Sequence, residues 1–108
     1  MKQEDFLEQK VFIGLTNKNK DKNSTDFYFS EEEFPEVLKH AEHFGISIYD
    51  IKTTLDGNIY ETVNHESFRK KATDSNWYNR EFKNLKRKQE GLLYSATYKV
   101  SKKLLARK

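Results

Sequence analysis

Apolar residues recur at helical spacing between residues 31 and 44. These residues lie three or four positions apart and are Phe34, Val37, Leu38, Ala41 and Phe44. The spacing predicts an amphipathic helix over residues 31–44. Ser30 and Glu33 form a capping box at its start, and Gly45 is typical of the position that follows a helix.

A second helix is predicted over residues 76–89. Its apolar face consists of Tyr78, Phe82 and Leu85. The preceding residues 73–75 are good capping residues, and Gly91 is expected at the end of the helix. A short helix over residues 66–72 is expected before this break.

Strand patterns lie near both ends of the chain. Alternating residues over 92–100 predict a C-terminal strand, although a helix through the same residues competes with it. Residues 11–15 and 26–29 are rich enough in β-branched and aromatic side chains to predict an N-terminal β-hairpin. The polar residues 17–25 between them are expected to form an exposed loop.

Residues 46–63 support two incompatible interpretations. In the first, Ser47 caps a short helix, and Ile48 and Ile51 share one of its faces because they are three positions apart. In the second, Asp56 and Gly57 form a type I′ turn that joins two strands. Periodicity favours the helix, because Ile48 and Ile51 cannot share a face of a regular strand. Residue propensity favours the hairpin.

These elements predict a small α+β single domain spanning residues 1–108, with an N-terminal β-hairpin, two to four helices and a C-terminal strand. Residues 1–9 and 102–108 are expected to be mobile ends. The chain has no Cys and no run of 18 apolar residues, and its first residues lack the apolar stretch of a secretory signal. We therefore expect a cytoplasmic protein.

Charge is distributed unevenly along the chain. Residues 1–65 hold 7 Lys or Arg and 13 Asp or Glu, whereas residues 66–108 hold 13 and 4, which together give the net charge of +3. Such an asymmetry is typical of a chain whose one end meets a polyanion, although the two halves could also pair with each other.

One segment has the spacing of a DNA-binding motif. The motif needs a small residue where two helices cross, a glycine at the turn, an aliphatic and a capping residue after it, and a buried β-branched residue in the second helix. The matching residues are Ala41, Gly45, Ile46, Ser47 and Ile51. Over about 25 residues the chain therefore resembles a helix-turn-helix motif. With the preceding residues 28–30, it is similar to the short DNA-binding repeats of phage proteins and intron-encoded nucleases.

This resemblance implies that a second helix enters the major groove and presents polar side chains to the bases. Those side chains are Ser47, Tyr49, Lys52 and Thr53. The acidic residues around the motif oppose this interpretation, because phosphate would repel them unless they face away. A helix followed by a β-hairpin explains the same apolar residues.

The basic second half is expected to contact phosphates without reading sequence. The phosphate-contacting candidates are Arg69, Lys70, Lys71, Arg80, Lys83, Arg87 and Lys88. Trp77, at the start of the most basic helix, is the candidate for stacking on a base. The alternative is a solvated charged face with Trp77 packed inward.

No catalytic set, cofactor site or metal site is expected. Four glycines leave little material for a phosphate loop, and His40 and His43 with Glu36 lack a fourth ligand. The sequence therefore predicts a non-enzymatic nucleic-acid-binding protein of phage or mobile-element type. Duplex DNA is the favoured partner, and a homodimer would suit it because paired modules read half-sites.

Two other functions remain open. One is a protein-binding inhibitor or immunity-type module, whose two charged regions would steer it to a protein partner. The other is an RNA-binding protein that uses the tyrosines of residues 92–100.

Overall fold

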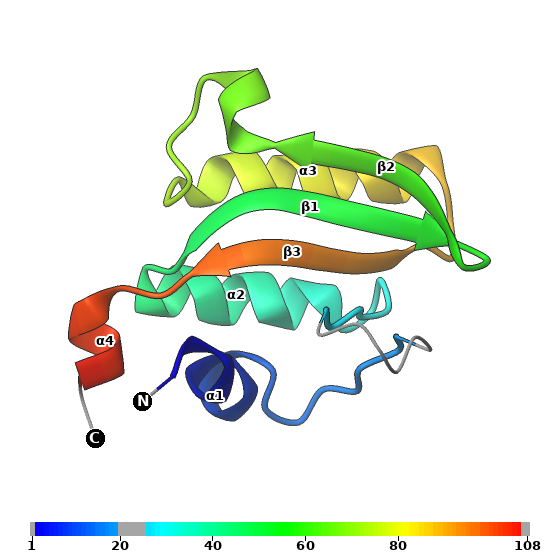
Figure 1. Ribbon diagram of the computed structural model, residues 1–108. Coiled ribbons are helices and arrows are strands. Elements are labelled where there is room, and N and C mark those ends of the chain that lie inside the picture. The colour runs from blue at the N-terminus through cyan, green and yellow to red at the C-terminus, as the bar shows by residue number, and fades with distance from the viewer. Residues whose placement is uncertain (1, 20–25, 107–108) are drawn as a thin grey trace.

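A three-stranded antiparallel sheet forms the centre of the computed structural model, which describes residues 2–19 and 26–106. The strands are β1 (Ser47–Leu55), β2 (Asn58–Asn64) and β3 (Leu93–Lys99), in the spatial order β2-β1-β3. Both neighbours of β1 run antiparallel to it. The α+β single domain expected from the sequence is confirmed (Figure 1).

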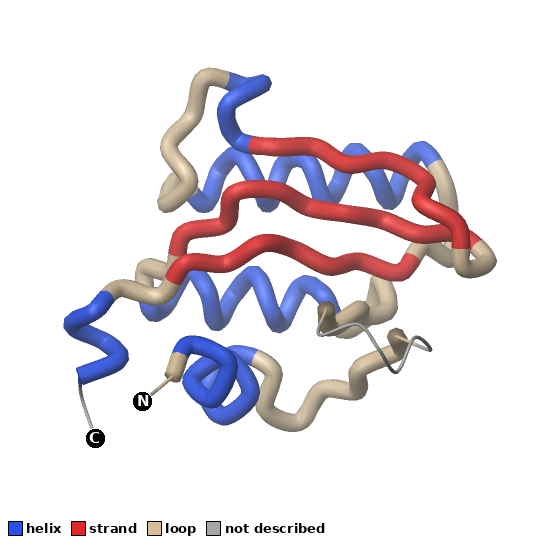
Figure 2. Tube along the Cα trace, in the orientation of Figure 1, coloured by secondary structure: helices blue, strands red, loops and turns tan. Residues whose placement is uncertain are grey.

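Two long helices cover one face of the sheet. Figures 1 and 2 show α2 (Phe34–Phe44) and α3 (Ser75–Lys88) lying side by side along the strands, α2 near β3 and α3 beneath β1 and β2. The α2 residues expected to face inward are buried, apart from the half-buried Phe44. In α3 the predicted apolar face is buried as well, and Trp77 and Glu81, which were not predicted to belong to it, are also buried.

The local signals at the helix ends are mostly confirmed. The Ser30 hydroxyl accepts a hydrogen bond from the Glu33 amide at 3.3 Å, although α2 begins only at Phe34. Gly45 adopts the left-handed conformation (φ 65°) that ends α2. Asp74 caps α3 by accepting from the Asn76 amide. Helix α3 stops at Lys88, before the Gly91 expected to end it.

The predicted N-terminal hairpin is wrong. Residues 3–11 form the short helix α1 (Gln3–Phe6) and a π-helical turn, η1 (Leu7–Val11). Phe6, Leu7 and Val11 are buried, and their positions are spaced as on one face of a helix. This helical pattern begins before the apolar run 11–15 from which the strand was predicted. Of the expected second strand, only Phe29 pairs with β3, through a single bridge to Tyr94.

Described segments near both ends of the chain pack against the core. The Gln3 side chain donates to the Tyr98 carbonyl and accepts from the Val100 amide, which ties α1 to the end of β3. At the other end α4 (Lys102–Ala106) carries the partly buried Leu104 and Leu105. Residues 107 and 108, and residues 20–25 of the expected loop, lie outside the described residues.

The hairpin alternative for residues 46–63 is correct, and the helical one is wrong. Leu55 pairs with Asn58 across a two-residue turn in which Asp56 (φ 52°) and Gly57 (φ 84°) both have positive φ, as a type I′ turn requires. Residues 47–55 are strand β1. The second helix of a helix-turn-helix motif is therefore not formed here.

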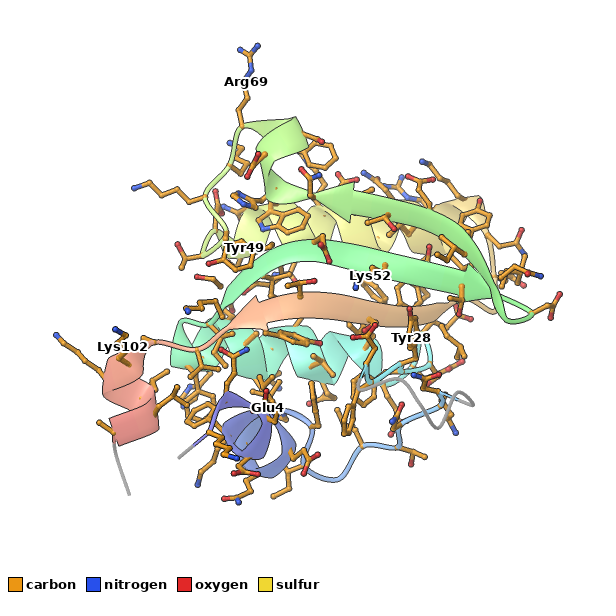
Figure 3. All side chains as sticks on the ribbon, viewed as in Figure 1. Glu4, Tyr28, Tyr49, Lys52, Arg69 and Lys102 are labelled. Atoms are coloured by element: carbon orange, nitrogen blue, oxygen red, sulfur yellow. The ribbon has the colours of Figure 1, made fainter. Side chains whose placement is uncertain are left out.

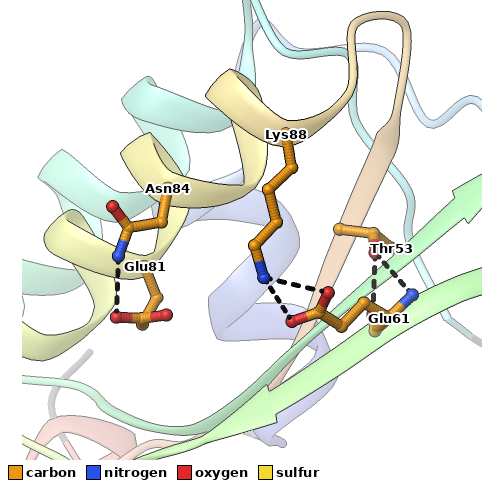
Figure 4. Close-up of polar contacts among 5 residues, drawn as sticks. All are labelled: Thr53, Glu61, Glu81, Asn84 and Lys88. Carbon is orange, nitrogen blue, oxygen red and sulfur yellow. Dashed lines mark hydrogen bonds and ion pairs between the residues drawn. The ribbon is translucent and has the colours of Figure 1, made fainter.

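Two bulges adapt the hairpin to the core. Ile48 and Ile51 are both fully buried, because the register of β1 against β3 shifts between Ile48 and Asp50, and Tyr49 is the extra residue. A second shift lies opposite Tyr60 in β2. Beside it the buried Thr53 hydroxyl donates to the Glu61 carbonyl at 2.7 Å and accepts from the Glu61 amide at 3.1 Å (Figure 4).

The sheet face opposite the helices is polar and partly covered by residues 26–28. Lys52 forms an ion pair with Asp26 (3.7 Å), and Asp50 accepts a hydrogen bond from Thr97 (2.9 Å). Figure 3 labels Tyr28 and Lys52 in this region. Burial and the nearby Asp26 raise the pKa of Tyr28, while Lys52 acts in the opposite direction.

Aromatic rings join the sheet to both helices. The fully buried Tyr94 stacks on Phe34 of α2 (5.2 Å between ring centroids) and meets the edge of Phe82 of α3 (4.9 Å). Tyr98 packs on Phe12, and burial raises its pKa. Because these tyrosines point into the core, β3 does not offer them for stacking on RNA.

No helix in the described part of the chain is long and apolar enough to cross a membrane.

We predict that Thr53→Val destabilises the protein by about 1–3 kcal/mol, because the partly buried Glu61 backbone groups lose the Thr53 hydroxyl as their partner. The matched control is Thr62→Val on the exposed face of β2, which should change the free energy of unfolding by less than about 0.5 kcal/mol. Urea unfolding monitored by circular dichroism measures both values. Equal effects of the two substitutions would show that the Thr53 hydrogen bonds do not stabilise the bulge.

Stability should fall between pH 10 and 12. Burial raises the pKa of Tyr94 to about 12, with Glu31 contributing less, and burial followed by Glu42 and Asp74 raises the pKa of Tyr78 to about 12. An unfolded tyrosine titrates near 10, so the stabilisation is complete below about pH 10 and is lost as the pH rises through 12. Tyr94→Phe should therefore lose less stability over this interval than the wild type. Urea unfolding at pH 8, 10 and 11 tests this, and identical losses would contradict it.

Candidate functional site

Helix α3 presents a row of polar and basic residues on the side away from its apolar face. Asn76, Arg80, Lys83 and Arg87 follow one another at intervals of four, three and four, which places them on one face of the helix. All four are exposed. We call Arg80, Lys83 and Arg87 the cation row.

The cation row borders a pocket between α3 and the turn η2 (His65–Phe68) with its following loop. The pocket has a volume of about 610 Å³. Its lining residues are Phe68, Lys70, Asn76, Trp77, Asn79, Arg80, Glu81, Lys83 and Arg87. We call it the α3–η2 pocket. Volumes between about 300 and 1,000 Å³ are usual for ligand sites.

Four of the seven predicted phosphate contacts line this pocket, namely Lys70, Arg80, Lys83 and Arg87. The other three do not. Arg69 points away from the body of the protein (Figure 3), and Lys71 is exposed on the loop after η2. Lys88 forms an ion pair with Glu61 of β2 at 3.3 Å (Figure 4).

The cations of the α3–η2 pocket are largely not neutralised by acidic residues. Within the described ranges, none of Lys70, Arg80, Lys83 and Arg87 takes part in an ion pair. The one carboxylate that lines the pocket belongs to Glu81, which is only 8% exposed. The pocket therefore combines four cations with one buried anion.

Glu81 and Arg87 are connected through Asn84. The Asn84 amide donates to the Glu81 carboxylate at 3.2 Å (Figure 4), and the Arg87 guanidinium donates to the Asn84 carbonyl oxygen at 2.9 Å. These contacts follow the helix at intervals of three residues, where side chains are neighbours. They orient the Arg87 side chain without neutralising it.

Trp77, the residue expected to stack on a base, is buried. Only 2% of it is exposed, and its ring packs on Phe68 with centroids 6.3 Å apart and planes at 23°. Phe68 is 38% exposed and lines the pocket. The accessible ring of the site therefore belongs to Phe68, which the sequence reasoning missed. The available signal was a Phe without a periodic apolar partner in the polar stretch 64–71.

The turn that carries Phe68 is held by local contacts. The Asn64 side chain caps η2 by accepting from the Ser67 amide at 2.9 Å. The His65 ring nitrogen Nδ1 lies 2.6 Å from the Lys70 carbonyl, and the His65 ring also lies against Trp77. These contacts position both Phe68 and Lys70 at the rim of the pocket.

The four predicted base contacts lie in β1 and are not brought to this pocket. Thr53 is buried and bonds to Glu61, and Lys52 pairs with Asp26 on the exposed sheet face. Ser47 is half-buried and pairs with Lys99 of β3. Tyr49 is 39% exposed at a bulge, with its ring near His65. These residues therefore do not form one base-reading face.

The charge asymmetry of the sequence corresponds to separate charged regions in the structure. Residues 65–88 contain eight Lys or Arg and three Asp or Glu, whereas residues 31–44 contain one Lys and five Glu. The remaining described basic residues near the C-terminus lie on and beside α4. Figure 3 shows Lys102 of α4 and Arg69 beyond η2 at different ends of the molecule. The basic second half thus forms two separate regions.

His40 and His43 contact residues of η1 and α2. The His40 ring nitrogen Nδ1 lies 2.8 Å from the Val11 carbonyl, which links α2 to η1, and the His43 ring packs on Phe44. No group of three or more potential metal-ligating side chains comes together within the described part of the chain.

Comparison with known proteins gives no match to a protein-family model, a curated protein or a solved structure.

Phe68→Ser should expose Trp77, since the Phe68 ring packs against the Trp77 ring. Trp77 is the single Trp of the chain, so its emission reports on this position alone. We expect a red shift of the emission maximum and stronger quenching by acrylamide. Phe68→Tyr is the matched control and should retain the wild-type spectrum. An unchanged spectrum in Phe68→Ser would contradict the stacked arrangement.

Proposed function

We propose that the protein binds nucleic acid without catalysing a reaction, and that η2 and α3 contact the phosphate backbone. The observation that carries the proposal is the α3–η2 pocket, where four of the sequence-predicted phosphate contacts meet beside an exposed aromatic ring. Clustered cations without acidic partners are suited to a polyanion, because binding releases the counterions of the phosphates.

The physical chemistry of the site favours backbone contact over base reading in a groove. Arginine guanidinium groups bind phosphate oxygens in a bidentate manner, and Lys83 adds a point charge between Arg80 and Arg87. The preference for duplex DNA depended on a recognition helix over residues 46–55, and those residues form β1 instead. The proposal therefore rests on charge and pocket shape. The proposed location of the protein is the cytoplasm.

Salt dependence is the first test. If three cations neutralise phosphates, affinity for a fluorescent oligonucleotide should fall roughly 20- to 40-fold between about 50 and 200 mM salt. Fluorescence anisotropy measures the dissociation constants. An affinity that does not change with salt would contradict backbone contact.

Charge reversal locates the contact. The triple variant Arg80→Glu, Lys83→Glu and Arg87→Glu should lower the affinity at low salt at least tenfold and flatten the salt dependence. The matched control, Lys99→Glu, Lys102→Glu and Lys103→Glu, changes the net charge equally but near α4, and it should retain most of the affinity. Circular dichroism checks that both variants fold.

Two outcomes would overturn the proposal. Equal losses in the two triple variants would mean that net charge alone drives binding. Absence of binding by the wild type at low salt, together with stoichiometric recovery of one protein from nuclease-treated lysate, would favour a protein-binding module.

A further inference from the structure

We propose that the α3–η2 pocket receives an unpaired base of a single-stranded nucleic acid, with Phe68 as the stacking surface. This inference rests on the proposed function and specifies the form of nucleic acid that the site takes.

Phe68 packs against Trp77 and is accessible at the pocket. The planes of the two rings are inclined by 23°, their centroids are 6.3 Å apart, and 38% of Phe68 is exposed. An exposed ring backed by a second ring is a rigid surface for base stacking. Bases within a duplex are already stacked on their neighbours, so a base must be unpaired and turned outward to reach Phe68.

The polar lining suits the edge of such a base. Asn76 and Asn79 line the same pocket, and their side-chain amides form no hydrogen bonds to other described residues. Each amide offers both a donor and an acceptor. Hydrogen bonds of this kind can be made to the base edges that pairing occupies in a duplex.

The cations are arranged for the backbone of one strand. Arg80 and Arg87 are seven residues apart in α3, or ~10 Å along the helix axis, with Lys83 between them. Lys70 extends the basic rim from the opposite side of the pocket. A strand whose base enters the pocket would thus have cations along α3 for its neighbouring phosphates.

The position of α3 disfavours insertion into a duplex groove. The helix lies flat beneath β1 and β2, and its N-terminal half is flanked by η2 (Figures 1 and 2). A recognition helix must instead project far enough to enter the major groove. The recessed shape of the site therefore favours a strand that bends into it.

The test compares four fluorescent probes on the full chain at low salt: a dT12 strand, an rU12 strand, a 12-base-pair DNA duplex and the mononucleotide dTMP. We expect both single strands to bind at least fivefold more tightly than the duplex, and dTMP to bind far more weakly than either. The difference between dT12 and rU12 identifies the sugar preference. Equal or tighter binding of the duplex would overturn the inference, as would dTMP binding as tightly as dT12.

Substitution of Phe68 isolates the stacking contribution. Phe68→Ala should weaken dT12 binding about 5- to 100-fold while leaving duplex binding within twofold, and Phe68→Tyr should restore most of the affinity. In the wild type, dT12 should also change the emission of Trp77, which lies directly behind Phe68. Thermal unfolding of Phe68→Ala establishes that the variant is folded at the assay temperature.

The outcomes separate this inference from the proposed function. If Phe68→Ala leaves dT12 binding unchanged while the cation-row variant abolishes it, backbone contact stands and base stacking is wrong. If no probe binds, both the proposed function and the inference fail.

Discussion

The packing of Tyr94 holds the sheet and the two long helices together. Its ring contacts Phe34 of α2 and Phe82 of α3, while its backbone exchanges two hydrogen bonds of 2.8 Å with Phe29. One buried side chain thus joins the sheet, both helices and the segment beyond the sheet edge. Because Phe82 faces this cluster, the opposite side of α3 must face solvent, and that side carries the cation row. The position of the basic surface follows from the packing of the core.

The elements with long periodic patterns could be predicted from the sequence. Helices α2 and α3 combine such patterns with capping residues, and strand β3 has an alternating pattern; the apolar faces of all three are largely buried. The N-terminal segment could not be predicted in the same way, because the run 11–15 suggests a strand locally. Its Val11 and Phe12 instead continue the helical spacing that starts at Phe6, and partners distant in the chain complete their burial. Tertiary contacts here outweigh local propensity.

The candidate site was predictable in its charges but not in its geometry. The spacing of Arg80, Lys83 and Arg87 indicates a shared face, and the structure places them at one pocket. Burial of Trp77 depends on η2, a turn that folds over it through contacts that no periodicity encodes. The three-residue spacing of the apolar Ile48 and Ile51, which a regular strand would place on opposite faces, was likewise an informative signal. It was resolved by a bulge at Tyr49 rather than by a helix, so a violated strand period can indicate a bulge as well as a change of element.

We propose that one face of the protein, formed by η2 and α3, contacts nucleic acid. The most direct measurement is the change in backbone amide chemical shifts when a short single-stranded oligonucleotide is titrated into the isotopically labelled chain. We expect the largest changes within residues 65–88, around Phe68 and the cation row, and little change in α2 and α4. Largest changes at α4 or on the exposed face of β1, with residues 65–88 unaffected, would contradict it.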